Sequence, residues 1–174
     1  MNAEELDVEI RLADLVGESV VDGKGIRMTI FTQGCPHRCE GCHNPTTHPF
    51  EGGHQFTLRK ITELIAKNPL LDGITLSGGE PFVWAKELAV LCRWVHEHNM
   101  NVWCYTGYTL EELNETARKN AGVKALLDET DVLVDGRFVL AERDLMLTFR
   151  GSRNQRVIDM KKTRESGAVT LLDL

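Results

Sequence analysis

The amino-acid sequence predicts an α/β fold organised around a mostly parallel sheet. Short apolar runs alternate with segments whose apolar residues recur at helical spacing, which is the pattern of strands and helices in βαβ units. Polar and glycine-containing stretches follow several predicted strands, and sites collect at the carboxyl ends of parallel strands. The chain has 174 residues, whereas a complete eight-unit β/α barrel needs about 250. The length therefore favours a smaller, open arrangement.

Six apolar runs are predicted as strands. Residues 26–31 are β-branched and apolar, which is typical of a strand buried on both faces. Residues 8–15 alternate loosely between apolar and charged side chains, which favours a strand at the edge of the sheet. In chain order, the predicted strands are residues 8–15, 26–31, 73–76, 102–105, 132–134 and 156–159.

Helices are predicted between these strands. Thr109 and Glu112 have the spacing of a capping box, so a helix is expected to begin there, with Leu110 and Leu113 facing the core. Two other helices are predicted from apolar residues at helical spacing: Leu58, Ile61, Leu64 and Ile65, followed by Pro69, and Leu88, Leu91, Cys92 and Val95. Stretches predicted to lack helix or strand are the turn-rich residues 17–25, the connector 48–55 and the polar tail 161–167, after which residues 169–172 are expected to pack back.

Composition and length predict one ordinary globular domain, residues 1–174. A formal net charge of -6 argues against binding to nucleic acid, which attracts basic surfaces. The acidic residues 1–5 lack the basic and apolar regions of a signal peptide, and no apolar run is long enough to span a bilayer. Because five cysteines occur without a secretory signal, we expect a reducing, cytoplasmic location and no membrane partner.

Three cysteines lie close together directly after the strand predicted at residues 26–31. Cys35, Cys39 and Cys42 have the spacing Cys-x3-Cys-x2-Cys, and thiolates at such short spacings hold iron–sulfur clusters. Three cysteines leave one iron of a 4Fe–4S cluster without a protein ligand, and an open metal position is typical of a catalytic site. The spacing therefore indicates a site of chemistry.

Two other interpretations of these cysteines stay open at this point. Structural zinc could take His37, His43 or His48 as a fourth ligand, although zinc sites often spread two Cys-x2-Cys pairs over separate segments. A disulfide would leave an odd thiol, and cytosolic chains rarely keep disulfides. Cys92 and Cys104 lie in a predicted helix and strand, and they are expected to be ordinary core residues.

The cysteine motif resembles the cluster motif of the radical S-adenosylmethionine (SAM) enzymes. Further stretches, in order along the chain, resemble the activating enzymes of glycyl-radical proteins and, more particularly, the activases of anaerobic ribonucleoside-triphosphate reductase. These stretches are residues 22–27, Cys42-His43-Asn44-Pro45, Ser77-Gly78-Gly79-Glu80-Pro81, Tyr105-Thr106-Gly107-Tyr108, residues 131–136 and residues 149–156. The resemblance covers most of the chain. Lys24 departs from the proline that is usual in the family.

The resemblance implies a fold, an activity and cofactors. The implied fold is a partial, open TIM-like β/α barrel of the radical SAM type, in which Cys35, Cys39 and Cys42 hold one 4Fe–4S cluster as the catalytic centre. SAM would bind the fourth iron, and an electron from the reduced cluster would cleave it to methionine and a 5′-deoxyadenosyl radical. That radical would take a hydrogen atom from a glycine of anaerobic ribonucleotide reductase, the protein substrate. A flavodoxin or ferredoxin is the implied electron donor.

Several further residues are candidates for cofactor binding. Gly78 and Gly79 allow close approach of a ligand to the backbone, and in the family this stretch bonds the methionyl amino group. Glu80 would place a carboxylate near the cationic sulfonium or ammonium. The alternative is a tight turn in which Glu80 caps the following helix.

Three loop residues and two residues at the ends of strands complete the predicted site. The residue before the third cysteine is usually aromatic in the superfamily and lies near adenine, but here it is Gly41. The Gly41 backbone and His43 are therefore the candidates for the adenine contact. Asn44 is expected either to bind SAM or to start a turn. Thr106 and Asp135 follow strands, and they are candidates either for the ribose or methionine of SAM or for helix capping.

The role of three polar residues late in the chain and the choice between several functions are not decided by the sequence. Arg150, Asn154 and Arg156 suit a docking site for phosphate or carboxylate, a structural network, or a contact with the reductase. The alternative functions are activation of another glycyl-radical enzyme such as pyruvate formate-lyase, a small-molecule radical SAM reaction such as deazaguanine synthesis, and a zinc or iron–sulfur electron-transfer module. The last would leave the Gly-Gly-Glu stretch unexplained.

Overall fold

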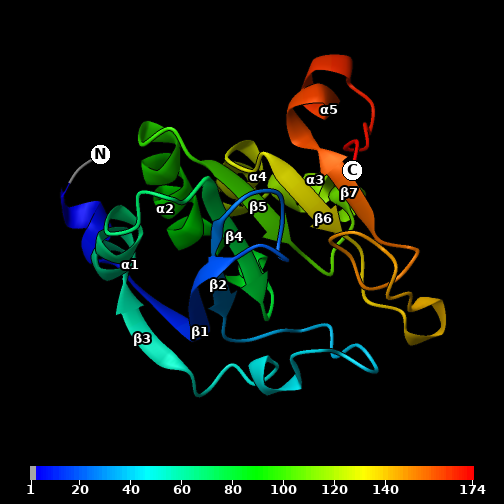
Figure 1. Cartoon of the computed structure of the whole chain (residues 1–174), viewed down its shortest axis with the longest axis horizontal. Coiled ribbons are helices and arrows are strands. Elements are labelled where there is room, and N and C mark those ends of the chain that lie inside the picture. Colours follow the sequence, from blue (N-terminus) through cyan, green and yellow to red (C-terminus); the bar gives the residue numbers. More distant parts are fainter. Residues whose placement is uncertain (1–2) are drawn as a thin grey trace.

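A computed structural model describes residues 3–174 as a mixed α/β fold around one seven-stranded open sheet (Figure 1). The strands are β1 (Glu9–Ser19), β2 (Arg27–Thr32), β3 (His54–Thr57), β4 (Gly73–Gly78), β5 (Asn101–Tyr105), β6 (Val132–Asp135) and β7 (Arg156–Asp159), in the order β3-β1-β2-β4-β5-β6-β7. β2, β4, β5 and β6 are parallel neighbours, and antiparallel pairs flank them on both sides. The mostly parallel sheet is therefore confirmed. Met1 and Asn2, the first residues of the acidic N-terminal segment, lie outside the described residues.

The helices follow the strands as the alternating pattern predicts. The α-helices in the described part of the chain are α1 (Leu58–Ala66), α2 (Ala85–Glu97), α3 (Leu110–Ala117), α4 (Ala121–Asp128) and α5 (Met160–Ser166), and short 3-10 helices occupy Ala3–Asp7, Pro45–Thr47, Pro81–Trp84 and Leu140–Glu142. α1, α2 and α3 lie where the sequence predicts them, and both hydrogen bonds of the capping box of Thr109 and Glu112 are present. Within residues 3–174, no helix combines the length and the apolar character needed to cross a membrane.

The prediction that residues 8–15 form an edge strand is wrong. β1 pairs with β2 on one side and with β3 on the other, with Ile10 opposite Phe56. β3 takes up the end of the segment predicted as the connector 48–55. β3 has only four residues, which are too few to show an alternating pattern in the sequence. It is a strand because it pairs with β1, which lies far away along the chain.

Two helices are absent from the prediction because their signals are short. Asn120 caps the start of α4, and its side chain accepts hydrogen bonds from the backbone N–H groups of Gly122 and Val123. α5 lies within the segment predicted as a polar tail. Asp159 caps its start, and Gly167 ends it in the left-handed conformation. The expected packing of residues 169–172 against the body is confirmed, because Leu172 N donates to Val157 O.

The two faces of the sheet carry different side chains, because successive residues of a strand point to opposite faces. Val102 and Cys104 of β5 belong to the main core, which the helices α1 to α4 also line. Trp103 and Tyr105 of the same strand belong to a smaller cluster on the other face, together with Val157. The helices thus cover one face, and the other face is left for a site at the strand ends.

His96 of α2 bridges two carboxylates at the amino ends of β5 and β6, away from the predicted site. Its Nδ1 lies 2.8 Å from Glu129 Oε2, and its Nε2 lies 2.9 Å from Asp131 Oδ2. Hydrogen bonding to Asp131, with a further contribution from Glu129, raises the pKa of His96 from its ordinary 6.5. Protonated His96 therefore stabilises the folded chain fully below pH 6.5, and this contribution is lost as the pH rises through the raised pKa.

We expect the free energy of unfolding to fall across this pH window, and His96→Gln to remove that part of the fall, because glutamine does not titrate. Urea titrations of both proteins at about pH 6 and about pH 9 measure the difference. Equal pH dependence in the two proteins would contradict the assignment to His96.

Candidate functional site

A cavity of about 380 Å³ lies beside the carboxyl ends of the parallel strands. Its walls include Cys35, Cys39 and Cys42 after β2, Gly78 and Gly79 at the end of β4, Thr106 and Gly107 after β5, and Gly136 after β6. The volume falls within the range of about 300–1,000 Å³ that is typical of small-molecule sites. In Figure 1 the loop after β2 (cyan) and the segment between β6 and β7 (yellow to orange) both extend toward the lower right. The segments that the sequence predicts to meet at one edge of the sheet are brought together.

The three motif cysteines line this cavity as free thiols. Backbone hydrogen bonds fix the start of their loop: Gly34 N donates to Thr47 O (2.8 Å), and Cys35 N donates to His48 O (3.1 Å). Burial raises the pKa of the Cys35 thiol, and backbone N–H groups that face its sulfur partly oppose this rise. Cys92 and Cys104 are fully buried in the main core, as predicted, and take no part in the cavity.

The donor set fits an iron–sulfur cluster. Among residues 3–174, no three His, Cys, Asp or Glu side chains converge on a point suited to a single metal ion. A 4Fe–4S cluster requires a different arrangement, because each cysteine thiolate binds a different iron and the cysteine sulfurs therefore lie around the cluster. Three thiols in one cavity, with Asn44 N donating to Cys42 Sγ (3.4 Å), provide thiolate ligands and a backbone N–H group of the kind that tunes such clusters.

Gly78 and Gly79 form the part of the cavity wall where the β4 loop touches the cysteine loop. Gly78 has a φ of 94°, which favours glycine. A Cβ at Gly79 would lie 2.3 Å from Gly34 O. Hydrogen bonds from Gly79 N to Thr32 O (2.8 Å) and from Glu80 N to Gly34 O (2.9 Å) hold the backbones of the two segments close together. The glycines are therefore required for the contact between the two loops, and they leave their backbone open to the cavity.

The Glu80 side chain lies beneath the cavity and does not line it. Glu80 is fully buried, and its carboxylate accepts hydrogen bonds from Thr106 Oγ1 (2.9 Å), Gly107 N (3.0 Å) and Phe82 N (3.1 Å). His37 Nε2 lies 2.6 Å from the same carboxylate. The bond to Phe82 N is the cap that the sequence offers as the alternative for Glu80. The hydroxyl of Thr106 is committed to Glu80, although Thr106 also lines the cavity.

The three predicted residues around the third cysteine differ in position. His43 and Asn44 line the cavity, whereas Gly41 does not. A Cβ at Gly41 would lie 2.9 Å from Leu140 Cδ1 and 3.4 Å from the Phe138 ring. The place of a side chain at position 41 is thus filled from the segment between β6 and β7. His43 packs on the same phenylalanine, with ring centroids 5.0 Å apart.

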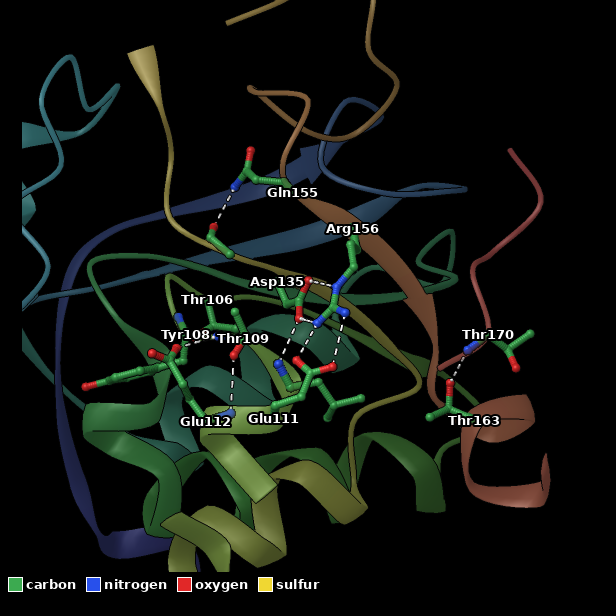
Figure 2. A network of polar contacts seen from close by, with 12 residues as sticks. Thr106, Tyr108, Thr109, Glu111, Glu112, Asp135, Gln155, Arg156, Thr163 and Thr170 are labelled. Carbon is green, nitrogen blue, oxygen red and sulfur yellow. Dashed lines mark hydrogen bonds and ion pairs between the residues drawn. The ribbon is translucent and has the colours of Figure 1, made fainter. Parts of the chain in front are cut away.

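Asp135 lies outside the main cavity, in a network with Arg156 and Glu111 (Figure 2). Figure 2 shows the guanidinium group of Arg156 between the two carboxylates. Arg156 Nε donates to Asp135 Oδ1 (2.9 Å), and Arg156 Nη2 donates to Glu111 Oε2 (2.7 Å). Asp135 Oδ2 also accepts from Leu110 N (2.8 Å) at the start of α3, so the helix-capping alternative describes its contacts. Hydrogen bonds to Asp135 and Glu111 raise the pKa of Arg156.

Replacing Arg156 with methionine leaves the buried carboxylate of Asp135 without its cation. We expect the free energy of unfolding to fall by about 2 kcal/mol, below the about 3–5 kcal/mol of a fully buried pair, because the Arg156 side chain is 31% exposed. Urea unfolding measures the change. Arg153→Met is the matched control, because Arg153 pairs with Asp144 while being 70% exposed, and its loss should cost less than about 1 kcal/mol. Equal losses in the two variants would show that the buried carboxylate is not the cause.

The structure separates the three late polar residues that the sequence groups together. Asn154 and Arg156 belong to structural networks, since Asn154 Nδ2 donates to Arg137 O (2.8 Å). Arg150 lines the cavity, and its Nη1 donates to Gln155 O (2.7 Å). Its Nε is buried and has no hydrogen-bond partner among the described residues. The guanidinium group gives the cavity wall a positive charge, which suits an anionic group on a bound ligand. A carboxylate-bearing ligand such as SAM therefore fits this cavity.

Several residues that line the cavity are not predicted from the sequence as cofactor contacts, among them His37, Gly107 and Phe138. His37 lies within the cysteine motif, and that position is the one sequence signal that points to it. Gly107 and Phe138 follow the ends of β5 and β6, which is the same signal that singles out Thr106 and Asp135.

Comparison with known proteins identifies close relatives. Residues 21–158 match the family described as 4Fe-4S single cluster domain. Relatives from Vibrio cholerae, Escherichia coli K12 and Enterobacteria phage T4 are each named anaerobic ribonucleoside-triphosphate reductase-activating protein. They are 40%, 36% and 32% identical to this chain over 78%, 78% and 79% of its length, and the matches cover 89%, 90% and 86% of the relatives. A crystal structure of QueE from Escherichia coli matches 58% of this chain and 54% of its own, at 16% identity and a TM-score of 0.47.

Proposed function

We propose a function from the premise that this chain belongs to the family of anaerobic ribonucleoside-triphosphate reductase-activating proteins. The chain is a radical SAM activase whose cofactors are a 4Fe–4S cluster and SAM, and it generates a glycyl radical on anaerobic ribonucleotide reductase. The observation that carries this function at the level of the molecule is the cavity itself. It combines three free thiols, a glycine-lined wall and the guanidinium group of Arg150.

The residues of the cavity divide into two sets by chemistry. Cys35, Cys39 and Cys42 would hold three irons of one cluster, because they are the thiols that line the cavity. The set proposed to hold SAM is His43, Asn44, Gly78, Gly79, Thr106 and Arg150. Of the other predicted residues, Glu80 and Asp135 would act through their neighbours, and Gly41 would make room for Phe138 and Leu140.

Held by Cys35, Cys39 and Cys42, a 4Fe–4S cluster would supply the single electron needed for reductive cleavage of SAM at the C5′–S bond, and SAM would supply the radical chemistry directed at a glycine Cα of the reductase. The chain's own residues bind, orient and shield. Gly78 and Gly79 would present backbone groups to the methionyl end, and Arg150 would place its guanidinium charge beside the carboxylate. Phe31 and Phe149 are apolar parts of the wall, and they would help to keep water from a bound ligand.

The proposal extends to the finer architecture. We propose that the sheet is a partial, open barrel of the TIM-like type and that residues 1–174 act as one radical SAM domain. The helices on one face and the small apolar cluster of Trp103, Val134 and Val157 on the other support a curved sheet with an inner face. One continuous sheet from β3 to β7 supports a single domain.

The electron donor and the compartment complete the proposal. A flavodoxin or ferredoxin would supply the single electron, which rests on the family resemblance and on the low potential that such clusters require. The cytoplasm is the proposed location, because all five cysteines are free thiols, as is usual in a reducing compartment.

The test is electron paramagnetic resonance after anaerobic assembly of the cluster and addition of a reductant, SAM and the reductase. We expect a glycyl-radical doublet on the reductase that depends on all four components. Cleavage of SAM without the doublet would assign the radical chemistry to another protein substrate. Binding of zinc in place of a cluster would overturn the function.

Arg150→Gln should weaken the binding of SAM by about tenfold or more, because a hydrogen bond to a charged group contributes about 1.5–3 kcal/mol. Equilibrium binding of SAM to the reconstituted protein measures the loss. Arg153→Gln is the control, since Arg153 lies in the same segment but pairs with Asp144 at the surface. Equal losses in the two variants would remove Arg150 from the SAM site.

A further inference from the structure

His37 lies between the first two cysteines of the motif, but it points away from solvent. Its side chain is 4% exposed, and its Nε2 lies 2.6 Å from Glu80 Oε2. Its ring also packs edge-on against Tyr108, with ring centroids 4.4 Å apart. A polar ring in such a position is held by specific contacts, because a buried polar group is costly unless it is hydrogen-bonded.

The partner of His37 is Glu80, whose carboxylate is bonded to residues of several loops. The Glu80 carboxylate accepts from Thr106 Oγ1 and Gly107 N, which follow β5, and from Phe82 N, which follows β4. Through His37 the same carboxylate reaches the loop that follows β2. Three segments that line the cavity are therefore joined at one buried group.

Gly107 leaves room for the ring of His37. A Cβ at position 107 would lie 2.4 Å from His37 Cδ2 and 2.7 Å from His37 Nε2. The backbone of Gly107 is not in the left-handed region, so alanine is compatible with its conformation. The three atoms that such a Cβ would approach most closely all belong to the histidine ring.

Residues 36–41 make few other hydrogen bonds to the rest of the described chain. Among the described residues, the bond from His37 to Glu80 is the one hydrogen bond made by a side chain of this segment. Backbone bonds hold the segment's start at Gly34 and Cys35, and Cys42 N donates to Cys39 O within the loop itself. The backbone N–H groups of His37 and Arg38 face the Cys35 sulfur within the same loop, so the histidine is the side chain that bonds this segment to another part of the chain.

We infer that His37 is a positioning residue that, through Glu80, latches the cysteine loop onto the β4 and β5 loops. The latch consists of His37, Glu80, Thr106 and Gly107. Its purpose rests on the proposed function, because the segment that it holds carries the cluster ligands. The latch is a property of the chain's own residues, so it exists before any cofactor binds, and it acts on the cluster only through the cysteines.

The first test measures the loop in the full chain without iron. Alkylation by iodoacetamide, followed peptide by peptide with mass spectrometry, reports on Cys35 and Cys39. The fully buried Cys92 and Cys104 report on global unfolding in the same sample. We expect His37→Ala to speed alkylation of Cys35 and Cys39 by about tenfold, the effect of losing a hydrogen bond to a charged group, and to leave Cys92 and Cys104 unchanged. His37→Gln, which retains an N–H donor, should restore much of the protection, and His54→Ala on exposed β3 is the matched histidine control.

A double-mutant cycle tests the geometry. Gly107→Ala alone should displace the ring and speed alkylation, whereas the same change in the His37→Ala background should add nothing, because the ring is absent. In the reconstituted protein the same variants should release iron to a chelator faster, in the same order. If alkylation and iron release in His37→Ala equal those of His54→Ala, the latch is refuted. Effects of Gly107→Ala that persist without the ring would also refute it. Because alkylation requires neither SAM nor the reductase, the latch and the proposed activity can fail separately.

Discussion

We expect Cys39→Ser to reduce cluster content and glycyl-radical formation on the reductase by more than about a hundredfold, and Cys92→Ala to leave both within about twofold of the parent protein. Losses from changes outside the ligand set are typically about 10–100-fold, and removal of a ligand should exceed them. Serine is close in size to cysteine, but its hydroxyl is not a thiolate, which is the ligand that holds an iron–sulfur cluster. Cys35→Ser and Cys42→Ser should behave in the same way, because all three thiols line the cavity.

The control separates loss of a ligand from loss of a cysteine. Cys92 is fully buried in the main core and has no contact with the cavity. Cys92→Ala removes one sulfur atom from a packed site, so it should cost about 1 kcal/mol of stability and no iron. Iron and sulfide content, visible absorption and the glycyl-radical doublet measure the outcome. A Cys39→Ser protein that keeps a full cluster and full activity would refute the assignment of the site.

Elements whose signal lies within one stretch of the chain are predictable from the sequence. The buried strand at residues 26–31 and the capping box of Thr109 and Glu112 depend on neighbours a few residues apart, and the structure has both. β3 depends on pairing with β1, whose residues lie more than forty positions earlier in the chain. No local sequence pattern therefore predicts β3. α4 and α5 have eight and seven residues, so their apolar periodicity is too short to be distinguished from a loop.

The features of the site likewise divide into those with a local sequence signal and those that depend on distant residues. The cysteine spacing is local, and the order of strands and loops predicts that four loops meet at one edge. The actual partners of the side chains are not local: Glu80 meets His37 across 43 positions, and Arg156 meets Asp135 across 21. For this reason the sequence places Glu80 and Asp135 in the site but cannot show that their carboxylates are already occupied. The functional assignment of the individual SAM contacts stays a prediction.

Gly79→Ala should disrupt the cavity, because the added methyl group would collide with the backbone of the segment that precedes the cysteine loop. The backbone of Gly79 tolerates alanine, but the new Cβ would meet Gly34 O at 2.3 Å and Thr32 O at 3.0 Å. Both are backbone atoms of the segment that leads into the cysteine loop, so relief requires the loops to separate. Separation breaks the bonds from Gly79 N to Thr32 O and from Glu80 N to Gly34 O. We expect the free energy of unfolding to fall by about 2–3 kcal/mol, from overpacking and lost hydrogen bonds, and SAM affinity to fall by at least about tenfold.

The comparison with Gly17→Ala decides whether the loss comes from this contact. A Cβ at Gly17 would meet nothing within 4 Å, so that variant should be as stable as the parent or slightly more stable. Urea unfolding, iron content and SAM binding distinguish the two. If Gly79→Ala retains the cluster and binds SAM as well as Gly17→Ala does, the loops can separate at no cost to the site. The close approach of Gly79 to Gly34 would then be a feature of the fold alone. A stable Gly79→Ala protein that assembles the cluster but fails to bind SAM would instead confine the role of the glycine wall to the ligand, because the thiols would have kept their places.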